Sequence, residues 1–322
     1  MKEEVKRKIS IIIPCYRSEK TLETVVKEVI DVINTKQEFF YEIILVNDNS
    51  PDQVWNVIKK LVQENTNIVG ISLTRNFGQH AALMAGFQKA TGDIIVSVDD
   101  DGQIPVDELF FLIDKLDEGY DVVYGIYPKS KKKKLRVFGT WINNKMTEIM
   151  LDKPKGLCTT SFYAAKKFVI DEVLRYKNPY PYMTGLILRA TKNIGTVQVN
   201  HRSRLYGKSG YHLKKLVALW INGFTAFSEK PLRIATYTGG ICAIAGFIYG
   251  IITIIRKLIN SNIQVGYSSL MAVVLFIGGV LMILLGIIGE YIGRIYISVN
   301  NAPQFVIREM IGKDINEKNT YL

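Results

Sequence analysis

The sequence predicts an α/β domain with a mostly parallel, Rossmann-like sheet, followed by two C-terminal transmembrane helices. Short apolar runs alternate with helical patterns as far as Tyr124, which is typical of a parallel sheet with helices on both faces. Polar residues end each apolar run, at the edge where such folds bind ligands. Two long uncharged segments later in the chain are each long enough to cross a bilayer.

The predicted strands are short apolar runs rich in β-branched residues. In chain order they are Lys8–Ile13, Tyr41–Val46, Ile68–Leu73, Asp93–Val98 and Asp121–Tyr124. The helices between them carry apolar residues spaced three and four apart, as on one helix face. They are predicted at Thr21–Ile33, Gln53–Gln63, Gln79–Ala90 and Val106–Leu116. Because the carboxyl ends of parallel strands meet at one edge, that edge is expected to carry the site.

Three consecutive aspartates, Asp99, Asp100 and Asp101, follow the fourth predicted strand. Unpaired carboxylates are costly to bury, so these belong at the mouth of the sheet. Asp99 and Asp101 are one residue apart, a spacing that lets both reach one divalent cation or its ligand. Magnesium takes carboxylate oxygens together with substrate phosphates. An acidic turn on a solvated strand end explains the same residues equally well.

The overall composition limits the classes of function. The net charge of +11 favours anionic partners such as nucleotide phosphates, anionic lipids or nucleic acid. Three scattered cysteines form no disulfide or zinc pattern, which fits a reducing compartment, and the charged N-terminus predicts no signal peptide. Pro14–Arg17 stands where a dinucleotide-binding fold needs a glycine-rich turn, which argues against a nicotinamide-dependent oxidoreductase.

The two uncharged segments predict a transmembrane hairpin with spans at about 234–255 and 268–289. Basic residues before and after the hairpin place both flanks in the cytoplasm by the positive-inside rule, although Arg256 and Lys257 in the short loop weigh against it. Glycines at three-to-four spacing allow close helix packing, and a homo-oligomer is left open. Two core helices of a soluble domain are the alternative.

Two further segments combine basic and apolar residues. A lysine run from Lys129, which includes Lys134 and Arg136, precedes Trp141, and Leu213–Phe227 mixes lysines with large apolar residues. Both predict interfacial helices that contact membrane lipids, with a solvated loop as the alternative for the first. Nucleic acid is disfavoured because aromatic residues are not interleaved with the basic ones on a sheet.

The predicted division of the chain has four parts. These are a catalytic domain at 1–212, a juxtamembrane amphipathic segment at 213–232, the hairpin at 233–290 and a cytoplasmic tail at 291–322.

Several motifs, in this order and spacing, carry a family resemblance. They are Pro14-Cys15-Tyr16 with Glu19, Val46–Ser50, Leu73–Gly78, Asp99–Pro105, Arg204–Tyr211 and Phe227–Arg233. From Ile9 to about Ile295 the chain resembles family-2 glycosyltransferases of the GT-A fold, and more narrowly the polyprenyl-phosphate sugar transferases with a C-terminal membrane hairpin. The resemblance implies transfer of a sugar, with inversion, from a nucleotide sugar, expected to be UDP-linked, to polyprenyl phosphate.

The resemblance also implies residue roles. Asp48 would hold the base, with Pro14, Tyr16 and Glu19 lining the base and ribose. Asp99 and Asp101 would hold Mg²⁺ or Mn²⁺ and the sugar diphosphate, whereas Asp100 is expected at the nucleotide-sugar site as an outward-facing neighbour. The other catalytic residues implied are Gln103, Arg75 and Arg204. The residues implied in binding the lipid phosphate or the diphosphate are Arg202, Arg204, Ser209, Tyr211, Lys214, Lys134 and Arg136.

Ser161 departs from part of the family, in which an aspartate stands before the phenylalanine of this segment. A carboxylate general base is therefore in doubt here. A lipid phosphate is already largely ionised near neutral pH and needs positioning more than deprotonation, whereas a sugar hydroxyl needs a base. The departure mildly favours a phosphate acceptor. A glycosyltransferase to a hydroxyl acceptor in glycolipid or polysaccharide synthesis, and a non-catalytic membrane scaffold, remain the alternatives.

Overall fold

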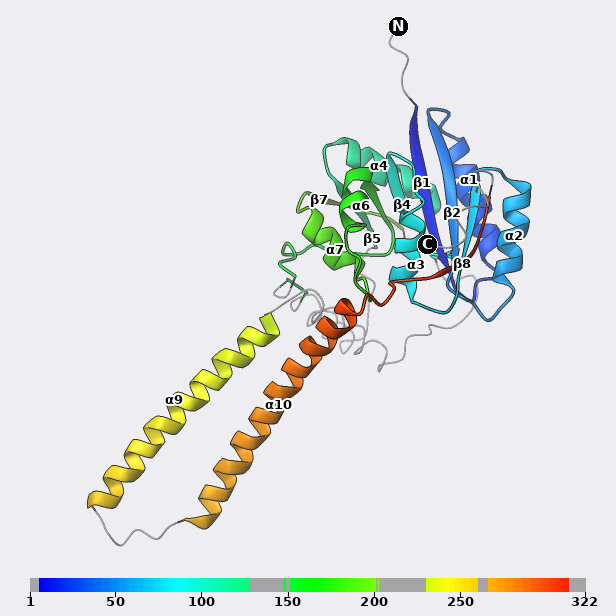
Figure 1. Ribbon diagram of the computed structural model, residues 1–322. Coiled ribbons are helices and arrows are strands. Elements are labelled where there is room, and N and C mark those ends of the chain that lie inside the picture. Colours follow the sequence, from blue (N-terminus) through cyan, green and yellow to red (C-terminus); the bar gives the residue numbers. More distant parts are fainter. Residues whose placement is uncertain are drawn as a thin grey trace. The chain divides into compact units, whose positions relative to one another are not determined.

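A computed structural model describes residues 6–127, 147–148, 151–200, 202, 230–259 and 266–312 (Figure 1). The chain divides into two compact units, residues 1–216 with 302–322 and residues 217–301. Both predicted interfacial helices lie outside the described residues.

The first unit contains one mixed sheet with strand order β7-β5-β6-β4-β1-β2-β3-β8. The strands are β1 (Arg7–Cys15), β2 (Phe39–Asn47), β3 (Ile68–Leu73), β4 (Ile94–Ser97), β5 (Val122–Ile126), β6 (Tyr163–Lys166), β7 (Ile194–Gln198) and β8 (Ile307–Ile311). β1 pairs in parallel with β2 and β4, and β2 with β3, which confirms the predicted α/β fold. β6 and β8 run antiparallel to their neighbours. Neither is among the strands predicted from the sequence.

Helices pack on both faces of the sheet (Figure 1). They are α1 (Leu22–Asn34), α2 (Val54–Glu64), α3 (Gln79–Phe87), α4 (Leu109–Asp117) after the 3₁₀ turn η1 (Val106–Glu108), α6 (Lys167–Val173) and α7 (Met183–Ala190). Alternate side chains of a strand point to opposite faces. Ile11 and Ile13 of β1 belong to the core that includes residues of α1, α2 and α4. Ile12 lies against Gly86 of α3, where an added Cβ would collide with it.

β8 lies within the segment 291–322 that the sequence predicts as a cytoplasmic tail. Its main chain adds to the edge of β3, and the backbone N–H of Thr74 donates to the carbonyl of Val306 at 2.9 Å. The Arg308 guanidinium donates to the Thr74 carbonyl at 2.8 Å, and the Trp55 indole donates to Glu309 at 3.1 Å. Residues that follow the hairpin in sequence therefore hold the loop that begins after β3.

The second unit contains α9 (Lys230–Ile259) and α10 (Tyr267–Val299), which run in opposite directions (Figure 1). The windows Ala235–Ile252 and Phe276–Val299 have mean hydropathies of 1.5 and 2.0, so both helices are long and apolar enough to cross a membrane. Only 6% and 0% of these windows are buried, unlike the core helices of a soluble domain. α10 ends at Val299, ten residues beyond residue 289, the predicted end of the second span.

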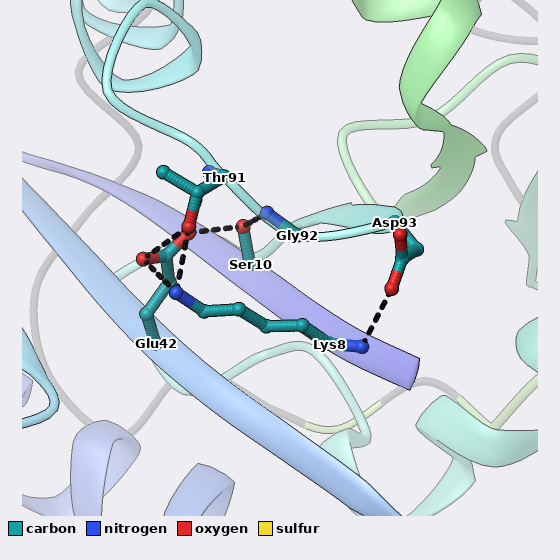
Figure 2. Close-up of polar contacts among 6 residues, drawn as sticks. All are labelled: Lys8, Ser10, Glu42, Thr91, Gly92 and Asp93. Atoms are coloured by element: carbon teal, nitrogen blue, oxygen red, sulfur yellow. Dashed lines mark hydrogen bonds and ion pairs between the residues drawn. The ribbon is translucent and has the colours of Figure 1, made fainter. Parts of the chain in front are cut away.

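A polar cluster occupies the amino-terminal edge of the sheet (Figure 2). Glu42 of β2 accepts hydrogen bonds from the Lys8 ammonium at 2.8 Å and the Ser10 hydroxyl at 2.5 Å. It also accepts the backbone N–H of Thr91 at 2.7 Å, and Gly92 N–H donates to Ser10 Oγ at 2.8 Å. This amino-edge cluster joins β1, β2 and the turn before β4.

Candidate active site

The carboxyl ends of β1, β2 and β4 lie side by side at the opposite edge of the sheet. The register pairs Cys15 with Asn47 and Ile12 with Ser97, so the loops that follow these three strands meet. The loop after β4 carries the three aspartates. We call the group formed by Asp48, Asp99, Asp100 and Asp101 at this edge the carboxyl-edge cluster.

Each carboxylate oxygen of Asp99 accepts a hydrogen bond from an uncharged side chain. Gln79, the first residue of α3, donates from its amide nitrogen to Oδ1 at 2.8 Å. The Ser161 hydroxyl donates to Oδ2. Ser161, noted in the sequence for the aspartate it replaces, thus contacts the aspartate loop. No motif in the sequence identifies Gln79, because its partner lies in another loop.

Asp100 was predicted to face outward, but its carboxylate turns toward the loop after β1. Its Oδ2 accepts the backbone N–H of Tyr16 at 2.8 Å, and its carbonyl accepts the Thr21 hydroxyl at 2.6 Å. Burial raises the pKa of Asp100 to about 6, and the charges of Asp99 and Asp101 act in the same direction. The prediction fails because the loop turns this carboxylate inward to satisfy an N–H of the loop after β1.

Asp101 and Gln103 form the end of the aspartate loop. Asp101 Oδ1 accepts the backbone N–H of Gln103 at 3.1 Å. Tyr127 follows β5 and was not predicted as a site residue. It lies close enough to the carboxyl-edge cluster for the cluster's charges to affect its pKa. Burial raises the pKa of Tyr127 to about 12, and the charges of Asp99 and Asp101 add to that shift.

Asp48, at the end of β2, is 3% exposed. Its two carboxylate oxygens accept the backbone N–H groups of Phe77 at 2.7 Å and Gly78 at 2.8 Å. Burial raises the pKa of Asp48 above its usual value, although these two hydrogen bonds act against the shift. Arg75 lies in the same loop, with its guanidinium 4.6 Å from the centre of the Phe77 ring.

The residues implied to line the base and ribose differ in exposure. Tyr16 is 42% exposed, with the Arg17 guanidinium 5.4 Å from its ring centre, so an aromatic face stands at this edge. Glu19 accepts the backbone N–H of Gln53 at 2.9 Å, at the start of α2. Pro14 is buried within β1, as part of the sheet.

Arg202 forms ion pairs in this structure. Its guanidinium bonds to Glu28 of α1 and, at 2.6 Å, to Asp107 of η1. Its backbone N–H donates to the Gln103 carbonyl at 3.4 Å, next to the aspartate loop. The other residues implied in phosphate binding lie outside the described residues, and they are Arg204, Ser209, Tyr211, Lys214, Lys134 and Arg136.

Asp99 and Asp101 supply the hard oxygen donors that Mg²⁺ and Mn²⁺ prefer. Among the described residues, no three His, Cys, Asp or Glu side chains are grouped so that they could hold a metal ion alone. Mg²⁺ commonly combines one or two carboxylates with waters and substrate phosphates, so two carboxylates at this edge suit such a cation.

Each of the two units matches the model of a known protein family. The profile of glycosyl transferase family 2 matches residues 10–174, and that of the GtrB C-terminal hairpin matches residues 230–295. The first match runs from Ser10, within β1, through α6 and contains every member of the carboxyl-edge cluster. The second covers α9 and most of α10.

Full-length relatives share about a third of their residues with this chain. An uncharacterized glycosyltransferase, YkcC, of Bacillus subtilis is 33% identical, covering 97% of this chain and 96% of its own. An undecaprenyl-phosphate 4-deoxy-4-formamido-L-arabinose transferase of Proteus mirabilis is 31% identical, covering 97% and 96%. A bactoprenol glucosyl transferase of Shigella flexneri, derived from a prophage, is 32% identical, covering 94% and 98%.

Solved structures support the fold alone. Glucosyl-3-phosphoglycerate synthase from Mycobacterium tuberculosis, in complex with Mn²⁺ and uridine-diphosphate-glucose, superposes with a TM-score of 0.51 at 18% identity. The match covers 68% of this chain and 77% of that one. Mannosyl-3-phosphoglycerate synthase from Rubrobacter xylanophilus gives a TM-score of 0.50 at 14% identity, covering 68% and 72%.

Proposed function

Because this chain belongs to glycosyl transferase family 2 and is a glycosyltransferase with a membrane hairpin, we propose that it transfers a sugar from a nucleotide sugar, UDP-linked, to polyprenyl phosphate. The observation that carries the proposal is the joint match, in one chain, of the transferase domain and the hairpin. Relatives named for undecaprenyl phosphate and bactoprenol share both parts over 94% or more of this chain.

The carboxyl-edge cluster supports a donor site in the first unit. Asp99 and Asp101 would hold Mg²⁺ or Mn²⁺ together with the diphosphate. When bound, such a cation neutralises charge that develops on the departing diphosphate. Arg75 and Arg204 would add positive charge, since a guanidinium offers a fixed fork of donors to phosphate oxygens. Gln103 fixes the Asp101 loop through its backbone N–H.

The base of the nucleotide would lie between Tyr16, Glu19 and Asp48. Tyr16 offers an exposed ring for stacking, and Glu19 is held by the start of α2. Asp48 shapes the same region by fixing Phe77 and Gly78. Asp100 supports the site from beneath, through the loop that presents Tyr16.

The acceptor proposal depends on chemistry at Ser161. The Ser161 hydroxyl is engaged with Asp99 and is a poor general base. A phosphate monoester carries its nucleophilic oxygen already ionised near neutral pH, since its second pKa is about 6. Such an acceptor attacks without losing a proton, in a single displacement that inverts the anomeric carbon. A hydroxyl acceptor would require a base.

The proposed location is the inner or plasma membrane, crossed twice by α9 and α10. Both ends of the chain and the catalytic domain would lie in the cytoplasm, where nucleotide sugars are found. The basic residues that precede the first span support this orientation by the positive-inside rule.

The test is to incubate purified protein in detergent with labelled nucleotide sugars, polyprenyl phosphate and Mn²⁺. We expect a lipid-linked sugar that mild acid releases, because a phosphate-linked sugar hydrolyses readily. An acid-stable product would favour a hydroxyl acceptor. No product with any common donor, together with an unchanged Asp101→Asn phenotype in cells, would favour a non-catalytic scaffold.

A further inference from the structure

Three consecutive residues, Phe77, Gly78 and Gln79, connect two carboxylates of the carboxyl-edge cluster. The backbone N–H groups of Phe77 and Gly78 donate to Asp48, at 2.7 and 2.8 Å. The next side chain, Gln79, donates to Asp99 Oδ1 at 2.8 Å. Asp48 follows β2 and Asp99 follows β4, so this segment joins two strand ends that β1 separates.

Gly78 gives the segment its shape. Its φ of +93° lies in the region that glycine adopts without strain, and no atom lies within 4 Å of an added Cβ. Glycine is therefore required at position 78 for its backbone conformation, and not because a side chain would lack space. The turn aims two successive N–H groups at Asp48 and starts α3 with Gln79 directed at Asp99.

Two uncharged donors contact Asp99. The Gln79 amide and the Ser161 hydroxyl each take one carboxylate oxygen, which fixes the rotation of the carboxylate. Neither of these two donors carries a positive charge. A carboxylate held in one orientation is suited to binding a cation.

We propose that Gln79 is a positioning residue for sugar transfer. With Ser161 it holds the Asp99 carboxylate in the orientation that the cation and diphosphate require. Through Gly78 and Asp48 it couples this half of the donor site to the half that binds the base. This inference rests on the proposed function, in which Asp48 and Asp99 contact the two ends of one nucleotide sugar.

The test measures binding to the full-length protein in detergent. Titration calorimetry would give Mn²⁺ affinity and the affinity of UDP with and without Mn²⁺, for Gln79→Ala and Ser161→Ala. The matched control is Gln88→Ala, at the other, exposed end of α3. We expect about a tenfold loss of Mn²⁺ affinity in both variants, as is typical when an outer partner of a ligand is removed.

Coupling gives a second expectation. Mn²⁺ should enhance UDP binding less in Gln79→Ala than in the wild type, and kcat should fall more than KM rises for the donor. Gln88→Ala should match the wild type in every measurement. Ser161→Ala reports on the other Asp99 oxygen and so keeps the test decisive if Gln79→Ala does not fold.

Two results would overturn the inference, and they are distinguishable. Unchanged Mn²⁺ affinity in Gln79→Ala and Ser161→Ala, with Asp99→Asn strongly impaired, would make Gln79 a structural contact only and leave the proposed function standing. Unchanged Mn²⁺ and UDP binding in Asp99→Asn and Asp101→Asn as well would refute the donor site itself.

Discussion

At the amino-terminal edge of the sheet, Glu42 accepts hydrogen bonds from an ammonium, a hydroxyl and a backbone N–H, whereas at the carboxyl-terminal edge Asp100 lies between two further aspartates. Burial alone would raise the pKa of Glu42, but its hydrogen bonds outweigh burial and lower the pKa below 4.5. Burial and neighbouring charges raise the pKa of Asp100 to about 6.

The two edges of one sheet thus differ in how their carboxylates are compensated. The amino-edge cluster supplies its own cation, so its carboxylate stabilises the fold. The carboxyl-edge cluster gathers like charges, which costs free energy that a bound cation or ligand would recover. The contrast favours the carboxyl edge as the proposed reactive one, and it leads to the following predictions.

The largest expected effect is on activity. Asp101→Asn should lower sugar transfer by about 100-fold or more, because it weakens the proposed hold on the cation that neutralises charge on the departing diphosphate. The melting temperature should stay the same or rise, since like charges are relieved. Product formation and thermal unfolding would be measured together. Asp117→Asn, which breaks the ion pair with Arg7 at the other edge, is the control and should leave transfer intact.

The next effect is on stability. Gly92→Ala should destabilise the protein by about 2 to 3 kcal/mol, because overpacking strains the backbone. An added Cβ would lie 2.7 Å from the Lys8 carbonyl and 2.8 Å from the Ser10 nitrogen, which cannot move easily. Denaturant unfolding would measure the loss, and transfer per folded molecule should be unchanged. A variant with wild-type stability would show that the amino-edge cluster tolerates more movement than these distances allow.

Much of this comparison could be predicted from the sequence, and the part that could not depends on distant contacts. The strand ends and the aspartate loop follow from local patterns of apolar and polar residues. The Ser161–Asp99 contact joins residues 62 apart, and the Arg308–Thr74 contact joins residues 234 apart. Local patterns predict that these loops share one edge of the sheet, but they do not specify which side chains contact one another there. The inward turn of Asp100 was missed for the same reason, since its partner Tyr16 follows another strand.

A smaller effect concerns pH. Because the folded-state pKa of Glu42 is lowered, its contribution to stability is present above the unfolded value, near 4.5, and is lost as pH falls through the folded value. Glu42→Gln should cost about 1 to 2 kcal/mol at pH 7, since the Lys8, Ser10 and Thr91 donors lose a charged acceptor. It should also flatten the decline in melting temperature below pH 4.5. An equally steep decline in the variant would assign the acid sensitivity to other groups.

The smallest expected effect compares two arginines, Arg7 paired with Asp117 at the amino edge and Arg202 paired with Glu28 and Asp107 near the aspartate loop. These groups are partly exposed, so Arg7→Met and Arg202→Met should each change stability by less than about 1 kcal/mol. Only Arg202→Met should lower transfer several-fold, because the lost ion pairs hold a backbone segment whose N–H bonds to Gln103 beside the aspartate loop.

Glu28→Gln then decides why Arg202 matters. If the ion pair holds the chain against the aspartate loop, Glu28→Gln should reproduce the several-fold loss of Arg202→Met, and kcat should fall in both. If Arg202 instead contacts phosphate during turnover, removing its carboxylate partner should free the guanidinium. Transfer would then be unchanged or faster in Glu28→Gln, while KM for the lipid acceptor would rise only in Arg202→Met. Steady-state kinetics of both variants, with Arg7→Met as the control, separate an arginine that holds structure from one that binds substrate.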